Sequence, residues 1–208
     1  MTRRPAAGGG FWVTVPPARL ERWLDGFAER HGEVTTTPAP DEVRLVAADG
    51  AEALVEVPFP PLSGDLLEHV RRERTVGVLL VRKGGHAAGV FVGDALVDSK
   101  VGTRHVQGRT AAGGWSQQRF ARRREGQTAV ATQAAADTAA RVLLGRELDA
   151  VVAGGDRGMV DDVLQDPRLR HLQVSGRLLD VPDPRLAVLQ AVPFRDVWIR
   201  VREPDGEG

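Results

Sequence analysis

Length, composition and charge exclude several classes of protein before any motif is considered. The chain has 208 residues, enough for one large domain or two small ones. Its 28 Lys and Arg residues balance its 28 Asp and Glu residues, which excludes a globally basic nucleic-acid binder, and the absence of Cys excludes disulfides, thiolate metal sites and cysteine nucleophiles.

The N-terminus predicts no targeting or membrane segment. Two arginines near the start are not followed by an apolar segment, and the longest strongly apolar run covers only residues 76–81. A helix that spans a bilayer needs about 20 such residues. We therefore expect a cytoplasmic protein with no membrane association.

Residues 1–65 predict a small α+β unit of unknown role. Residues 11–15 alternate as a strand does, and a helix follows, with apolar residues at helical spacing: Leu20, Trp23, Leu24 and Phe27. Residues 35–40 are expected to form a loop, and residues 43–47 and 53–57 two short strands.

Residues 66–208 predict a second and larger domain. Three strands at 75–81, 88–92 and 95–101 are separated by short glycine-containing turns and form a meander. A long helix follows at 116–144, with small and apolar residues on one face.

The same domain ends in further alternating elements. We expect a buried strand at 149–153, a short helix at 157–164, a last helix around 184–190 and a last strand at 196–201. The last strand is expected to complete a mixed sheet flanked by helices, so the fold class is α+β.

The balanced charge conceals a strongly basic segment. Residues 99–124 contain no Asp or Glu but seven cationic residues: Lys100, Arg104, Arg109, Arg119, Arg122, Arg123 and Arg124. The remaining residues must therefore sum to minus seven. Clustered arginines are typical of phosphate binding, although arginines on a helix are also common on a plain solvated surface.

Two adjacent glycines precede the basic helix. Gly113 and Gly114 allow the backbone to approach a ligand closely, and a helix N-terminus directly behind them favours an anion. Helical spacing places Arg119, Arg122 and Arg123 on one face. The segment therefore predicts a loop that enters a space lined by nucleic acid.

The sequence of residues 113–124, Gly-Gly-Trp-Ser-Gln-Gln-Arg-Phe-Ala-Arg-Arg-Arg, resembles the catalytic loop of archaeal and eukaryotic class I peptide-release factors. Ser116 and the Arg-Phe-Ala-Arg run from Arg119 to Arg122 are in register with that family, whereas Trp115 stands where the family has its glutamine. Ser116-Gln117 is similar instead to the Vms-like relatives, and most of all to their actinobacterial branch of peptidyl-tRNA hydrolases.

This resemblance covers roughly residues 70–203 and implies a ribonuclease-H-like release-factor catalytic domain. It also implies peptidyl-tRNA and the large subunit of stalled ribosomes as partners. No ATP or metal motif is visible in the sequence, so we expect no cofactor and no metal.

The resemblance assigns Gln117 as the catalytic residue. A glutamine amide does not titrate near neutral pH, so Gln117 is expected to hold a water or stabilise developing charge at the peptidyl-tRNA ester. Backbone N–H groups around Gly113, Gly114 and Ser116 are expected to contact the oxyanion. The RNA contacts are assigned to Trp115, by base stacking, and to the seven cationic residues.

Several alternatives stay open at the level of sequence. Gln118 is adjacent to Gln117 and competes with it for the catalytic role. The activity is either ester hydrolysis or cleavage of tRNA near its 3′ CCA end, as in eukaryotic Vms-like relatives, and a non-catalytic ribosome-binding module is a third possibility. His105, the pair Asp161-Asp162 and the turn Gly154-Gly155 are weaker candidates for chemistry.

Overall fold

The structure is a computed structural model that describes residues 3–103 and 117–204, including all of their side chains except those of residues 103 and 117–128. The chain divides into two compact units. The first unit comprises residues 1–72 and 193–208, and the second comprises residues 73–192.

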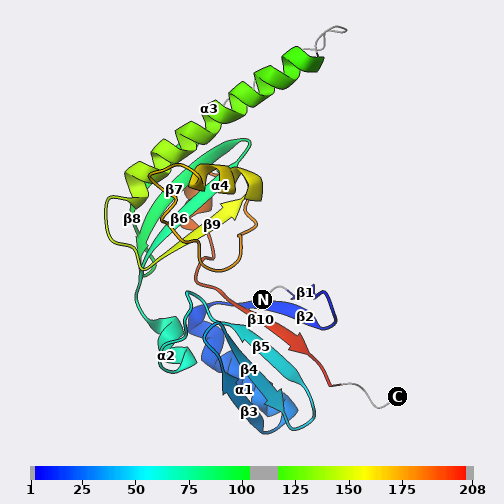
Figure 1. Ribbon diagram of the computed structural model, residues 1–208. Coiled ribbons are helices and arrows are strands. Elements are labelled where there is room, and N and C mark those ends of the chain that lie inside the picture. The colour runs from blue at the N-terminus through cyan, green and yellow to red at the C-terminus, as the bar shows by residue number, and fades with distance from the viewer. Residues whose placement is uncertain (1–2, 104–116, 205–208) are drawn as a thin grey trace. The chain divides into compact units, whose positions relative to one another are not determined.

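The first unit is built on a six-stranded antiparallel sheet in the order β1-β2-β10-β5-β4-β3 (Figure 1). The strands are β1 (Arg3–Pro5), β2 (Phe11–Val15), β3 (Val34–Pro38), β4 (Glu42–Ala47), β5 (Glu52–Glu56) and β10 (Val197–Arg202). A 3-10 turn η1 (Pro17–Arg19) leads into α1 (Leu20–His31), and α2 (Leu66–Arg71) follows the sheet.

Helix α1 covers one face of this sheet. Its buried side chains are Leu20, Trp23 and Phe27, and the rings of Trp23 and Phe27 stack with their centroids 5.6 Å apart. Buried residues alternate along β2, β4, β5 and β10 and meet them from the sheet side. Gly32 ends the helix at φ 85°, a conformation that favours glycine. The predicted strand and helix in this part of the chain are confirmed.

The last strand lies in the first unit, which corrects one expectation from the sequence. β10 pairs with β2 on one side and β5 on the other, so Ile199 lies between Val13 and Val55. It does not complete the second sheet. The alternation Val-Trp-Ile-Arg-Val correctly predicts a strand, but alternation reports which residues face a core and not which strands are neighbours.

The strand β3 replaces a predicted loop. Residues 34–38 pair antiparallel with β4 at the edge of the sheet. Apart from its last residue, a proline, this strand has one apolar residue, Val34. The alternation of apolar residues that predicts a strand is therefore missing, although Val and Thr favour an extended backbone. The short β1 and α2 were also absent from the sequence-based prediction.

The second unit contains a four-stranded mixed sheet in the order β8-β7-β6-β9. Strands β6 (Thr75–Arg82), β7 (Gly85–Val92) and β8 (Ala95–Thr103) form the predicted antiparallel meander, and β9 (Ala150–Gly155) runs parallel to β6. The predicted α+β class with a mixed sheet is confirmed.

Helices lie on both faces of the second sheet. α3 (Gln117–Leu143) and α4 (Arg157–Leu164) share one core with Leu79, Val81, Ala88 and Val90. α5 (Leu186–Gln190) lies on the other face, where Leu189 closes over Gly89 and a Cβ at Gly89 would lie 2.9 Å from the leucine Cδ2.

Candidate functional site

The basic segment of the sequence begins in β8 and continues into α3. Lys100 is exposed on β8, and Gln117 is the first residue of α3 that the structure describes. The remaining assigned residues within α3 fall in its first turns: Arg119, Arg122, Arg123 and Arg124. The others lie outside the described residues: Arg104, Arg109, Gly113, Gly114, Trp115 and Ser116, together with His105.

Helix α3 is long, and its later part packs against the sheet. It has 27 residues, which corresponds to a length of about 40 Å. Its core residues recur at helical spacing and fall within residues 135–143, which we call the anchored part: Ala135, Ala136, Ala139, Val142 and Leu143. The spacing in the sequence predicts a buried face at positions 131, 134, 135, 139, 142 and 143, and the last four of these are in the core. Ala134 is exposed, Ala131 is half-buried, and Ala136 is buried although it was not predicted.

Residues 117–134, the outer part of α3, lead away from this core. Ala135 comes 18 residues after Gln117, which corresponds to about 27 Å of helix. Val130 of the outer part is 68% exposed, and Figure 1 shows α3 running well beyond the end of the β6–β8 sheet. The start of α3 is therefore carried far from the core of the second unit.

A buried polar contact joins the anchored part of α3 to the sheet. His86 on β7 places Nε2 3.0 Å from Oγ1 of Thr138, which is only 3% exposed. Gly102 lies directly opposite His86 on β8, and a Cβ at Gly102 would collide with the imidazole ring. Glycine at this position therefore allows the imidazole to lie between β8 and α3.

The environment of His86 favours the neutral imidazole. Burial is the main cause that lowers the pKa of His86, and the positive charge of Lys100 lowers it further. The register places Lys100 two residues before Gly102, on the same face of β8. The first residue of the basic segment is therefore electrostatically coupled to the contact that holds α3.

An exposed ionic cluster holds the same turn of α3 from the solvent side. Arg168 donates to Asp137 Oδ1 and Asp166 Oδ2, both at 2.7 Å, and its Nε donates to Asp166 Oδ1 at 2.9 Å. Gln133 also donates to Asp137 Oδ1 at 3.1 Å. Hydrogen bonds from Arg168 lower the pKa of Asp166 to about 2 and also lower that of Asp137.

The weaker candidates from the sequence, the pair Asp161-Asp162 and the turn Gly154-Gly155, do not form a binding site among the described residues. Asp161 and Asp162 lie on α4, and within the described residues no group of three His, Asp or Glu side chains could hold a metal ion. A Cβ at Gly154 would lie 2.9 Å from the Leu80 side chain, and Gly155 adopts φ +104° against Val81. This glycine pair packs β9 closely against β6.

The contacts that hold α3 were not identified from the sequence. His86 and Thr138 are 52 positions apart, and Asp137 and Arg168 are 31 apart. No motif joins such pairs, because a histidine in a strand and a threonine in an Ala-rich helix are each ordinary residues in those elements. A hydroxyl on the otherwise apolar face of α3 is the one signal that points to a buried polar contact.

Comparison with known proteins identifies most of the second unit. The family described as the Actinobacteria/chloroflexi VLRF1 release factor matches residues 74–202, which include β6 to β10 and α3. No curated protein matches the chain. None of the helices that the structure describes is both long and apolar enough to cross a membrane.

Proposed function

Because this chain belongs to the Actinobacteria/chloroflexi VLRF1 release factor family, we propose that it hydrolyses the ester bond of peptidyl-tRNA and releases nascent chains from stalled ribosomal complexes. The observation that carries the proposal is the match itself, which spans β8, α3 and the basic segment between them. The activity places the protein in translation and, in our proposal, in the cytoplasm with peptidyl-tRNA and the large ribosomal subunit as partners.

The length of α3 supports an active site that reaches into a confined space. The ester of a ribosome-bound peptidyl-tRNA is surrounded by RNA, so the catalytic group has to be presented on a narrow element. About 27 Å of helix separates Gln117 from the first core residue of α3. A single helix of about 10 Å diameter carrying the reactive group is suited to this access.

The position of Gln117 in the chain supports its role at the ester. Gln117 lies in the described part of α3, 18 residues before the core residue Ala135, and it follows the run Gly-Gly-Trp-Ser directly in the sequence. The amide of Gln117 would hold the attacking water, and backbone N–H groups of Gly113, Gly114 and Ser116 would contact the oxygen on which negative charge develops.

The cationic residues supply RNA affinity in this proposal. Lys100, Arg104, Arg109, Arg119, Arg122, Arg123 and Arg124 would contact phosphates, and Trp115 would stack on a terminal base of the tRNA. The acid-free stretch of 26 residues supports this assignment, because a carboxylate within it would repel the phosphates. The acidic remainder of the chain would limit binding of RNA elsewhere.

The decisive experiment compares wild type with Gln117→Ala on purified peptidyl-tRNA, both free and on stalled large subunits. We expect Gln117→Ala to slow peptide release by about 100-fold or more, the usual cost of losing a positioned group at a developing charge. Gln118→Ala is the matched control, because it removes the neighbouring amide of the same helix and should release peptide at nearly the wild-type rate.

Analysis of the tRNA product separates the competing activities. An intact CCA end after peptide release supports ester hydrolysis. A shortened tRNA would show instead that the protein is a nuclease that cleaves the tRNA. Unchanged release by Gln117→Ala together with loss in Gln118→Ala would transfer the catalytic role to the second glutamine. Absence of release from both substrates would contradict the proposal and leave a binding module.

A further inference from the structure

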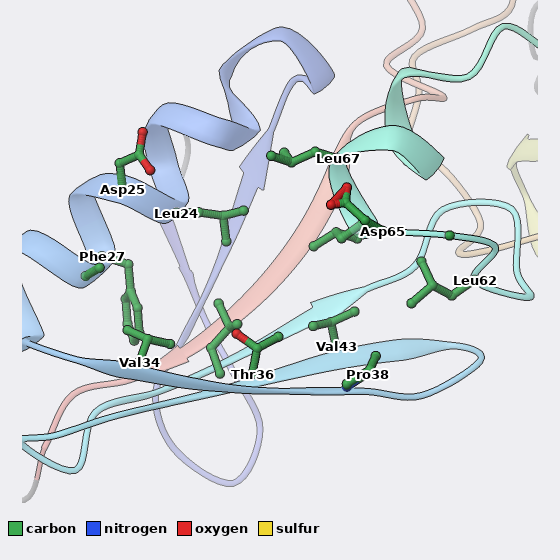
Figure 2. A pocket seen from close by; sticks show the side chains of 14 residues that line it. Leu24, Asp25, Phe27, Val34, Thr36, Pro38, Val43, Leu62, Asp65 and Leu67 are labelled. Carbon is green, nitrogen blue, oxygen red and sulfur yellow. The ribbon is translucent and has the colours of Figure 1, made fainter.

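The first unit contains an apolar groove that the proposed hydrolase activity does not use. It has a volume of about 410 Å³ and is lined mainly by aliphatic side chains. Figure 2 shows Leu24 and Phe27 of α1 on one side, Leu62 and Leu67 on the other, and the inner face of β3 and β4 as the floor. Two exposed carboxylates, Asp25 and Asp65, belong to its lining.

The floor of the groove ends at an open sheet edge. Among the strands of the described residues, β3 pairs with β4 alone. Ala39 N–H bonds to Glu42 O at 2.8 Å and Ala48 N–H to Glu33 O at 2.9 Å, so odd-numbered residues of this segment make the hydrogen bonds to β4. The N–H groups of Val34 and Thr36 and the carbonyls of Val34, Thr36 and Pro38 therefore point outward.

The outward-pointing backbone and the groove belong to the same residues. Val34, Thr36 and Pro38 pair with Ala47, Leu45 and Val43, and therefore have their side chains on the α1 side. Val34, Thr36 and Pro38 all line the groove. A strand added beside β3 would thus place every second side chain next to the mouth of the groove.

The two edges of this sheet differ in how they are protected. At the opposite edge, β1 consists of Arg3, Arg4 and Pro5, and charge, proline and shortness all discourage pairing with another chain. β3 is Val-Thr-Thr-Thr-Pro, without a charged residue, and its one proline is the last residue. Edge protection is therefore present on β1 and missing on β3.

We propose that β3 and the apolar groove bind an extended peptide segment of a partner protein, which adds as a strand to the edge and carries an apolar side chain flanked by Lys or Arg. Backbone pairing would supply affinity, and the groove would select the apolar side chain. Asp25 and Asp65 would select the cationic residues on either side of it. This site is independent of the proposed hydrolase chemistry.

A second copy of the same chain fits the site poorly. Pairing of two β3 strands would bring only Val, Thr and Pro side chains to each groove, and these are too short to fill about 410 Å³. It would also supply no cation to Asp25 or Asp65, because β3 contains none. A basic and apolar partner satisfies both the volume and the charge.

The test selects binders for the full-length protein from a displayed library of random peptides of about seven residues, a length that spans β3 with some margin. We expect enrichment of peptides with a large apolar residue and Lys or Arg two positions away. Hydrogen exchange with the strongest synthetic peptide should then protect the amides of Val34 and Thr36 and leave those of Thr35 and Thr37 unchanged.

Three variants divide the interaction into its parts. Thr36→Pro removes the outward N–H of Thr36, besides replacing one side chain that lines the groove, and should weaken binding about tenfold. Asp25→Asn with Asp65→Asn should weaken it severalfold and abolish its salt dependence, and asparagine retains the helix cap in which Asp65 Oδ1 accepts from Glu68 N–H at 2.9 Å. Glu29→Gln, on α1 but outside the groove, is the matched control and should bind as wild type does.

Other outcomes would overturn the proposal. These are the absence of enriched peptides, enrichment of peptides without basic residues, or binding that Thr36→Pro leaves unchanged. Dimerisation of the wild type that Thr36→Pro abolishes would assign the edge to a second copy. Peptide release from peptidyl-tRNA should be unaffected by all of these variants, so failure here is distinguishable from failure of the proposed hydrolase function.

Discussion

The two parts of α3 differ in what their surroundings require of them. In the anchored part, residues 135–143, three alanines followed by Val142 and Leu143 lie in the core. Thr138 contacts His86 of the sheet, and Asp137 accepts a hydrogen bond from Arg168. In the outer part, Val130 is largely exposed and the sequence is rich in arginine. One continuous helix thus combines a fixed base with a cationic end.

The difference shows how a protein without net charge can carry a basic segment at a distance from the core of its second unit. The core holds the base of α3 with apolar packing on one side and polar contacts on two sides, so the direction of the helix is determined at residues 135–143. The outer part contains Arg119, Arg122, Arg123 and Arg124, the arginines of α3 to which the proposed function assigns contacts with RNA phosphates.

The largest expected difference between the two parts concerns stability. Leu143→Ala removes a side chain that is 1% exposed and should lower the free energy of unfolding of the second unit by about 2–5 kcal/mol. Val130→Ala, on the same helix, should change it by less than about 0.5 kcal/mol. Hydrogen exchange of the β6 and β9 amides measures the free energy of unfolding of both variants. Equal losses in Leu143→Ala and Val130→Ala would contradict the distinction between the anchored part and the outer part of α3.

A smaller effect is expected from pH acting on the polar contact at the base. Because the pKa of His86 is lowered in the folded state, mainly by burial, its contribution to stability is complete above its ordinary value of 6.5. It should be lost progressively as the pH falls below that value. His86→Gln retains a hydrogen-bonding side chain near Thr138 without titrating, so its stability should fall less between pH 7 and about 5. Denaturant unfolding at a series of pH values measures this difference. If the free energy of unfolding fell equally with pH in wild type and in His86→Gln, His86 would not have this role.

The smallest effect is expected from the exposed ionic cluster. The pKa of Asp166 is lowered to about 2 from its usual 3.8, so the stability it contributes is present above pH 4 and is lost as the pH falls toward 2. Arg168→Met should lower the thermal midpoint slightly at neutral pH and low salt. The difference from wild type should disappear in acid and shrink in high salt. Calorimetric scans at two pH values and two salt concentrations measure the thermal midpoints of both proteins. A difference in midpoint that persisted in acid and in high salt would show that Arg168 contributes by packing rather than by charge.

The elements of the second unit follow from its sequence more directly than those of the first. Continuous apolar runs, glycine turns and the apolar face of a long helix predict β6 to β9, α3 and α4, because deep burial requires a continuous apolar strand or an apolar helix face. β3 escapes recognition because an edge strand with one exposed face needs few apolar residues. The pairing of β10 with β2 escapes it because strands at opposite ends of the chain leave no local signal of their contact.

The candidate site also combines features that the sequence predicts with contacts that it does not. The charge pattern and the Gly-Gly pair predict the basic segment from the sequence, because phosphate binding and backbone approach restrict residue types locally. Gln117 is assigned by the resemblance of residues 113–124 to release factors, and its catalytic role stays a prediction. His86, Thr138, Asp137 and Arg168 support α3 only through contacts between distant elements. The groove beside β3 likewise depends on three segments that meet only after folding.

The position of β10 has a consequence for the synthesis of this protein. The second unit, residues 73–192, is an insertion into the first, and β10 occupies the middle of the first sheet between β2 and β5. A ribosome that makes this chain finishes the second unit before it makes β10. Vectorial folding should therefore mature the second unit first. Until β10 emerges, the β2 and β5 edges that pair with it would stay open and the core under α1 would lack Val197, Ile199 and Val201. Premature termination before residue 197 should therefore yield a chain with a folded second unit and an unfinished first.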